Sequence, residues 1–217
     1  MWSELERPWQ VCLELAWEAY CDDCVPIGAV VIDAAGNILS RGRNRVYPRH
    51  MWKEHPLGAE IAHAEVEALR NLDFTAGDWH EYALYTTTEP CPMCLGTLYM
   101  SGVRRLYYAA RDPFGGSTNL LGKTWYLSRK PVKVFGPETP AFENILIALF
   151  VEQDCGLNSG RLPVGDFYHR MGEAVGDAVE LGQRLWKMGE LPRLRRVHAS
   201  AAEMVDSLSN GLKLTLL

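Results

Sequence analysis

Two short motifs carry the side chains best suited to chemistry. The segment His63–Glu65 (HAE) offers an imidazole and a carboxylate, and the segment Pro90–Cys94 (PCPMC) offers two thiols. A catalytic zinc ion commonly takes three protein ligands and leaves a fourth position to water, so His63, Cys91 and Cys94 are the candidate ligands. Zinc makes water acidic, and a nearby carboxylate can take the released proton and pass it on; Glu65 is the candidate for that role. The set is suited to hydrolytic removal of ammonia from an amine-bearing ring carbon.

The elements around the motifs must bring these groups together. Pro92 in the first turn of a helix places Cys91 at its N-cap and Cys94 one turn inside, where the positive helix end favours thiolate. His63 and Glu65 are two residues apart and do not share a helix face, so we expect them to straddle the first turn of a second helix. The alternative is a structural zinc site, but such a site has no use for Glu65.

The order of elements predicts an α/β protein. Apolar periodicity indicates helices from a Ser3–Glu6 capping box to about residue 20, and over about 61–71, 92–102 and 141–154. Strands are expected over 27–33, 38–46, 82–87, 104–109 and 132–135. A helix separates the third strand from the fourth, so these two should be parallel. Two βα units beside a leading hairpin give a three-layer α/β/α arrangement, a mixed five-stranded sheet with helices on both faces.

The spacing H-x-E followed by P-C-x-x-C resembles the signature of the zinc-dependent cytidine/deoxycytidylate deaminase superfamily. Residues 89–94 look most like the branch of tRNA adenosine deaminases and guanine deaminases, and residues 26–31, 42–45 and 110–112 agree. The resemblance covers roughly residues 5–155. It implies a cytidine-deaminase-like fold, a Zn²⁺ cofactor, a homodimer, and substrate contacts from Asn44, Ala64, Pro90 and Asp112.

The chain is expected to have two parts, a deaminase domain over 1–155 and a helical C-terminal extension over 156–217 packed on it. The residues around 155–160 are rich in Gly, Asn and Ser, which is typical of a boundary. The helix that follows, about 164–189, contains four glycines and is weak in isolation. Ser200 and Glu203 have capping-box spacing for a last helix, and Gly211 stands where its C-cap would be.

Composition and charge narrow the location and the partners. No apolar run is long enough to span a bilayer and the N-terminus lacks a signal peptide, so a cytoplasmic protein without membrane contact is expected. Its six cysteines are then ligands and core residues. The net charge is −5; residues 1–155 hold 14 Lys and Arg against 20 Asp and Glu. Proteins that bind RNA usually have more Lys and Arg than Asp and Glu, so a small-molecule substrate is favoured over a nucleic acid.

These observations favour a zinc-dependent aminohydrolase that deaminates a nucleobase or nucleoside, either a purine such as guanine or adenosine, or a cytosine-type base. A tRNA-specific adenosine deaminase acting at the wobble position fits the motifs equally well. The second alternative is a non-catalytic, zinc-stabilised interaction protein.

Other polar groups have ordinary explanations. Cys21 and Cys24 make a second Cys-x-x-Cys, with His50 and His55 in the loop 47–59, but free thiols and loop residues are expected. The arginines of the second strand, Arg41, Arg43 and Arg45, could hold a phosphate, but are expected to form a solvated strand face.

Overall fold

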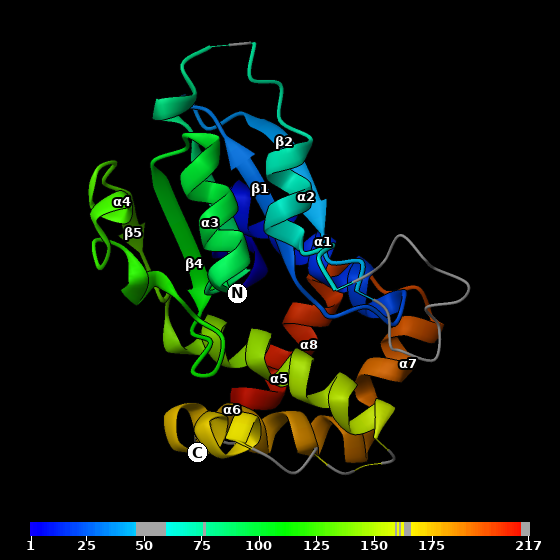
Figure 1. The fold of residues 1–217 in the computed structure, drawn as a ribbon. Helices are drawn as coiled ribbons and strands as arrows, with labels where there is room; N and C mark the ends of the chain where they lie inside the picture. The colour runs from blue at the N-terminus through cyan, green and yellow to red at the C-terminus, as the bar shows by residue number, and fades with distance from the viewer. Residues whose placement is uncertain (47–59, 76, 159, 161, 163–165, 214–217) are drawn as a thin grey trace.

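The fold is built on a five-stranded sheet. A computed structural model describes residues 1–46, 60–75, 77–158, 160, 162 and 166–213; the loop 47–59, with His50 and His55, lies outside them. The strands are β1 (Gly28–Ile32), β2 (Ile38–Arg43), β3 (Ala83–Thr88), β4 (Arg105–Ala110) and β5 (Lys133–Phe135), in the order β2-β1-β3-β4-β5 (Figure 1). β1 is antiparallel to β2 and β3, whereas β3, β4 and β5 are parallel. The prediction of a mixed five-stranded sheet with a parallel β3–β4 pair is confirmed.

Helices cover both faces of this sheet. They are α1 (Arg7–Cys21), α2 (Ala64–Arg70), α3 (Pro92–Ser101), α4 (Trp125–Ser128), α5 (Pro140–Leu157), α6 (Asp166–Met188), α7 (Glu190–Arg196) and α8 (Ala201–Lys213), with short 3₁₀ turns at Trp2–Glu4, Trp79–Glu81 and Thr118–Leu120. Successive residues of β1 alternate between the two layers. Val31 packs with α2 and α3, whereas Val30 packs with α1 and α5. Every residue of β1 is buried, as expected for a central strand covered on both faces.

Two glycines bring helices directly against the strands. A Cβ on Gly28 would lie 2.1 Å from the carbonyl oxygen of Cys12 in α1, and one on Gly42 would lie 2.1 Å from the carbonyl oxygen of Ala64 in α2. No side chain fits at either position. The first turn of α2 therefore rests on the backbone of β2, which sets where its N-terminus lies.

Two predicted helix caps are wrong. Glu6, not Ser3, is the N-cap of α1, and Trp2–Glu4 forms a separate 3₁₀ turn because Pro8 occupies the first turn of α1. Gly211 does not end α8, which continues to Lys213. The predicted Ser200–Glu203 capping box is present: the Ser200 N–H donates to Oε2 of Glu203 at 2.7 Å, and the Glu203 N–H donates to Oγ of Ser200 at 3.2 Å.

The C-terminal helices share a hydrophobic cluster with α1 and α5. α5 extends to Leu157, so residue 155 lies within its last turn. α6 packs along α5 at Gly182, where a Cβ would lie 2.6 Å from Cβ of Val151. The backbone of α6 is non-helical at Val175 (φ −144°, ψ 40°) and divides this helix into two halves. In the described part of the chain, no helix is long and apolar enough to cross a membrane.

Candidate active site

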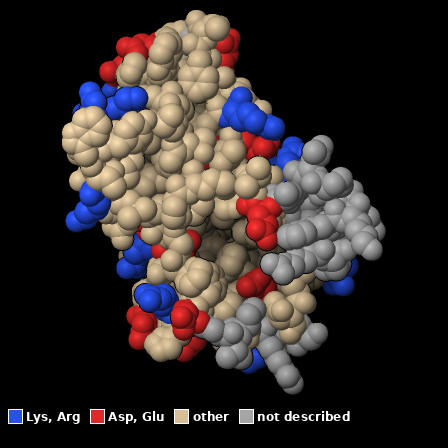
Figure 2. Space-filling view, viewed as in Figure 1, with Lys and Arg blue, Asp and Glu red and all other residues tan. Residues whose placement is uncertain are grey.

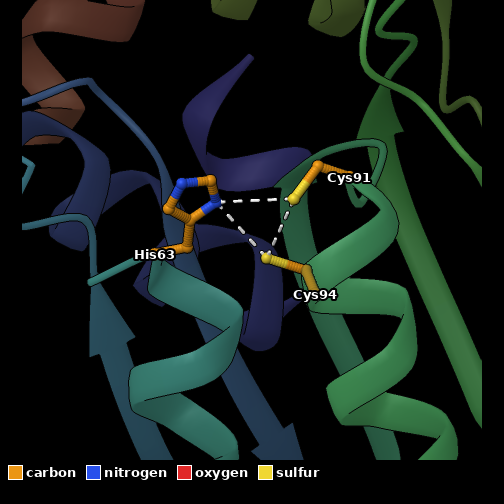
Figure 3. Close-up of side chains that lie close together, drawn as sticks. All are labelled: His63, Cys91 and Cys94. Carbon is orange, nitrogen blue, oxygen red and sulfur yellow. Dashed lines mark hydrogen bonds between the residues drawn. The ribbon is translucent and has the colours of Figure 1, made fainter. Parts of the chain in front are cut away.

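His63, Cys91 and Cys94 converge at the start of two helices. His63 is the N-cap of α2 and Cys91 is the N-cap of α3, with Cys94 in the first turn of α3. His63 Nδ1 lies 3.6 Å from the Cys91 sulfur and 3.4 Å from the Cys94 sulfur, and the two sulfurs are 3.6 Å apart (Figure 3). Tetrahedral zinc with ordinary bond lengths needs separations of about 3.8 Å between sulfurs and about 3.6 Å from sulfur to nitrogen. The three atoms therefore fit a zinc ion with little movement.

The sulfur pair already favours negative charge. Hydrogen bonding from Cys94, assisted by His63, lowers the pKa of Cys91 to about 3. The same bond and burial raise the pKa of Cys94, and hydrogen bonding to Cys91 raises the pKa of His63. The geometry thus favours a thiolate at Cys91, and a divalent cation would favour deprotonation of the second sulfur as well.

Glu65 lies beside the ligands and is oriented from the sheet. Its side chain is buried, with the residue 3% exposed. Oε1 accepts a hydrogen bond from the Thr86 hydroxyl at 3.2 Å, and Oε2 lies 3.4 Å from the Cys94 sulfur. His63 precedes the helix on extended backbone, so its ring reaches the same spot although it stands only two residues from Glu65. Burial raises the pKa of Glu65, which suits a group that must hold a proton during part of a reaction.

A cavity of about 210 Å³ opens beside the ligands at the carboxyl ends of β3 and β4. Its walls carry the ligand His63, the polar side chains of Asn44 and Asp112, and apolar side chains from α5 and α6. The space-filling view shows a hollow between the sheet and the lower helices (Figure 2). Pockets at this edge of an α/β sheet are common ligand sites.

The four predicted substrate contacts divide into two pairs. Asn44 and Asp112 line the cavity. Oδ1 of Asn44 accepts from the Val46 N–H at 2.7 Å, a bond that does not use its amide NH₂ group. Ala64 and Pro90 are buried beside the metal ligands and are not among the lining residues.

Asp112 is held by its own loop. Oδ1 accepts hydrogen bonds from the N–H groups of Phe114 at 3.0 Å and Gly115 at 2.8 Å. Burial raises the pKa of Asp112, because the carboxylate has lost much of its water. These two bonds fix the orientation of the carboxyl group at the cavity wall.

Glu89 and Ser117 join this loop to the cysteine loop. Oε1 of Glu89 accepts from both the N–H and the hydroxyl of Thr118, and the Ser117 hydroxyl donates to the carbonyl of Pro90 at 2.8 Å. Sequence analysis missed these supports and also Thr86. For Thr86 a signal existed, because a run of threonines in a buried strand needs polar partners.

An ion pair between the exposed Arg111 and the buried Glu143 fixes the start of the same loop. Nε and Nη2 of Arg111 each donate at 2.8 Å to Glu143 of α5, and the Arg111 N–H donates at 2.9 Å. Burial alone would raise the pKa of Glu143, but the bonds from Arg111 lower it below its usual value. Through this pair, α5 positions the segment that carries Asp112.

The other candidate groups do not join the site. Among the described residues, the only set of three or more potential ligands close enough for one metal ion is His63, Cys91 and Cys94, so Cys21 and Cys24 are not part of one. Arg43 pairs with Asp22 at 2.6 Å, and Arg41 and Arg45 are exposed.

Comparison with known proteins agrees with this geometry. The cytidine and deoxycytidylate deaminase zinc-binding region matches residues 3–110. The chain is 30% identical to the cytosine deaminase of Candida albicans over 113 residues, 52% of this chain and 70% of that protein. It is 36% identical to the tRNA-specific adenosine deaminase of Haemophilus influenzae over 109 residues, 49% of this chain and 58% of that protein. The structure of a guanine deaminase from Nitrosomonas europaea aligns with a TM-score of 0.52 at 25% identity, covering 69% of this chain and 85% of that one.

The chain belongs to this family of zinc-binding deaminases. Its relatives deaminate different bases, as the names of the cytosine, tRNA adenosine and guanine deaminases state. The aligned region spans from 19% to 70% of the length of the curated relatives it matches.

Proposed function

We propose that this protein is a zinc-dependent aminohydrolase that releases ammonia from a nucleobase or nucleoside, with a purine as the first candidate. The observation that supports it best is the position of Glu65. A buried carboxylate that lies beside three zinc-ligand atoms without belonging to them is suited to proton transfer. A cavity with mostly apolar walls reaches the ligand His63 and can admit a planar ring.

His63, Cys91 and Cys94 would hold the zinc ion, which supplies activation of water when bound. Glu65 takes a proton from that water at a carboxylate oxygen, delivers it to the ring nitrogen of the substrate, and later moves a proton to the departing ammonia. The Thr86 hydroxyl keeps the carboxylate of Glu65 aimed at the reacting atoms.

Asn44 and Asp112 would orient the ring. The amide NH₂ of Asn44 can donate to a ring nitrogen or carbonyl, and the carboxylate of Asp112 can accept from an N–H. The wall between them is largely apolar, so these two groups are suited to fixing which edge of the base faces the metal.

A small substrate fits the charge distribution better than a tRNA. Affinity for RNA comes largely from Lys and Arg side chains that neutralise phosphates. On the face shown in Figure 2, Lys and Arg are scattered and mixed with Asp and Glu. Helix α5, beside the cavity, contains Glu143, Glu152 and Asp154 and no Lys or Arg. Because a relative of this chain is named a tRNA-specific adenosine deaminase, the second candidate function is deamination of a tRNA wobble adenosine.

The test is ammonia release from a panel of free bases, nucleosides and a tRNA anticodon stem-loop. Zinc-loaded protein should turn over at least one free base or nucleoside, and the rate should change little between low and physiological salt because few counterions are released. Turnover of the stem-loop alone, with steep salt inhibition, would support the tRNA enzyme instead. Stoichiometric zinc with no ammonia from any substrate would support the non-catalytic zinc-stabilised alternative.

The domain division is also a proposal: residues 1–155 form the deaminase domain and 156–217 an extension that depends on it. In support, the buried residues of α6 and α8 belong to the same hydrophobic cluster as those of α1 and α5. About 60 residues rarely build a stable core alone. A fragment 156–217 expressed alone should show no cooperative thermal transition, and a sharp transition would contradict this division.

Assembly and location complete the proposal. A homodimer is supported by apolar side chains on the outer side of α3 and α4, where Met100 is 67% exposed and Trp125 is 74% exposed. Light scattering should give the molar mass of a dimer for wild type. Met100→Glu should give a lower average mass, because it places a charge in the apolar contact. None of the six cysteines, all of them among the described residues, forms a disulfide, which fits a reducing compartment such as the cytoplasm.

A further inference from the structure

Helix α6 lies beyond the residues that match the deaminase family, yet it forms part of the candidate active-site wall. The family match ends at residue 110, whereas Phe167 and Met171 of α6 line the same cavity as His63. We propose that Phe167 and Met171 determine substrate specificity by restricting the pocket to an unattached nucleobase. This inference rests on the proposed deaminase function and names its substrate class.

Phe167 connects the two sides of the pocket mouth. Its ring centroid lies 5.3 Å from that of Phe114, at 73°, and 5.6 Å from that of Phe150. Phe114 belongs to the loop that carries Asp112, and Phe150 belongs to α5. Phe167 thus joins the loop of Asp112 to α5 at the cavity wall.

The position of this wall is fixed by α5. The Tyr168 hydroxyl donates to Asp154 at 2.5 Å and holds the first half of α6. The second half packs on α5 at Gly182, where any side chain would overlap Val151. The non-helical residue Val175 between them changes the direction of the chain, so the two halves of α6 can meet different surfaces. Phe167 and Met171 are therefore held at the cavity by contacts on both sides of the break.

The size and chemistry of the cavity fit one base. Its volume is about 210 Å³, below the roughly 300–1,000 Å³ of pockets that hold drug-sized ligands. Apolar side chains predominate around it and include two phenylalanines and a methionine, and aromatic rings and thioethers pack well on a flat heteroaromatic ring. A ribose brings several hydroxyl groups, which the apolar side chains of α5 and α6 cannot satisfy. A free base can be held by Asn44 and Asp112, two of the polar residues that line the cavity.

The experiment compares Phe167→Ala, Phe167→Leu and Met171→Ala with wild type in the zinc-loaded full-length protein. Glu173→Ala is the matched control, because Glu173 is on the same half of α6 and its side chain is exposed. Kinetics are measured with matched pairs of free base and nucleoside, for example guanine and guanosine. Zinc content and far-UV circular dichroism report on folding, and Phe167→Leu keeps the packing volume if the alanine variant unfolds.

Wild type should prefer the free base by at least tenfold in kcat/KM. Phe167→Ala should raise KM for the base by roughly tenfold with kcat changed much less, since losing one apolar contact in a pocket is worth about 10- to 200-fold in discrimination. Phe167→Ala should also reduce the preference in kcat/KM for the free base over the nucleoside. Glu173→Ala should have the same KM and the same preference as wild type. Equal use of base and nucleoside by wild type, or folded Phe167 and Met171 variants with unchanged KM and preference, would overturn the inference.

Equilibrium dialysis of free guanine and guanosine against the zinc-loaded proteins separates this inference from the proposed function. Suppose that no substrate releases ammonia, but wild type still binds guanine more tightly than guanosine and Phe167→Ala loses that difference. The specificity role of Phe167 is then confirmed and the catalytic proposal fails. If wild type binds guanine and guanosine equally well, the specificity role of Phe167 and Met171 is refuted, whatever the rate of ammonia release.

Discussion

Replacing Glu65 by glutamine should remove the chemistry and retain the metal. Glutamine has nearly the same shape and can still accept a hydrogen bond from Thr86, but it cannot carry a proton. The three ligand atoms His63 Nδ1, Cys91 Sγ and Cys94 Sγ are untouched, so zinc binding should remain stoichiometric. Positioned acid–base groups contribute about 10²–10⁴ in rate, and Glu65 would act at more than one step. We therefore expect a loss in kcat of at least about 10³, or about 4 kcal/mol of transition-state stabilisation.

The same substitution should stabilise the metal-free fold. Glu65 is almost fully buried, and its carboxylate contacts the Thr86 hydroxyl at 3.2 Å and the Cys94 sulfur at 3.4 Å. Burial raises its pKa, so keeping it ionised at neutral pH costs folding free energy that a neutral amide does not cost. The expected gain is up to about 3 kcal/mol, the usual range for a poorly satisfied buried group. A residue that weakens the fold while serving the reaction shows the common trade between stability and activity.

The assay combines three measurements: zinc by mass spectrometry, ammonia release, and thermal unfolding of the chelator-treated protein at pH 7. Glu67→Gln is the control, because Glu67 is in the same helix and pairs with Arg70 at 2.8 Å, away from the ligands. Glu65→Gln with full zinc and kcat within tenfold of wild type would refute the proton-transfer role. A loss of zinc together with activity would show instead that Glu65 is a ligand.

Three further outcomes follow from the contacts. Cys91→Ala should lose both zinc and activity in the same assays, because it removes one of three metal bonds. Gly182→Ala should lower the free energy of unfolding by about 1–3 kcal/mol, since the new Cβ would lie 2.6 Å from Val151; an unchanged denaturant midpoint would contradict that packing. Arg111 holds the pKa of Glu143 below its usual value, so this pair stabilises the fold above the unfolded pKa of about 4.3 and loses that effect as pH falls through the folded pKa. Glu143→Gln should therefore destabilise at pH 7 by about 1–3 kcal/mol and flatten the acid limb of a stability–pH curve.

The sheet and the metal ligands were predictable because their signals are local. β1 reads as a continuous apolar run and is buried on both faces, and the PCPMC motif defines a helix start with two thiols on one side. The parallel pairing of β3 and β4 follows from the helix between them. Each of these three signals lies within fewer than thirty consecutive residues.

The supports of the site were not predictable in the same way. Thr86 meets Glu65 across 21 residues, and Glu143 meets Arg111 across 32. Nothing near either carboxylate in the sequence indicates its partner, because the partners meet only when two elements pack. The convergence of His63 and Glu65 was expected from resemblance; its physical cause is the extended backbone of His63 before α2, which local sequence does not specify.

The contribution of α6 was missed for a related reason. Its glycines indicated a weak helix, but only packing shows that Gly182 is a contact point with α5 and that Phe167 reaches the cavity. An apolar residue on a helix most often belongs to the core, and sequence alone does not separate a core residue from a pocket wall.

The segment that follows β4 links the reaction to the choice of substrate. The family match ends at Ala110, and within the next four residues Arg111 pairs with α5, Asp112 enters the cavity wall, and Phe114 contacts Phe167 of α6. The metal-ligand candidates and Glu65 all lie before or within α3. In the proposed enzyme the chemistry would come from these residues, whereas substrate choice would come from Asn44 together with this loop and α6. Because the loop is held from both sides, changes in α5 or α6 can reshape the pocket without moving the zinc ligands. Such an arrangement would allow one zinc-binding region to serve different substrates. The relatives of this chain are named as deaminases of cytosine, guanine and tRNA adenosine.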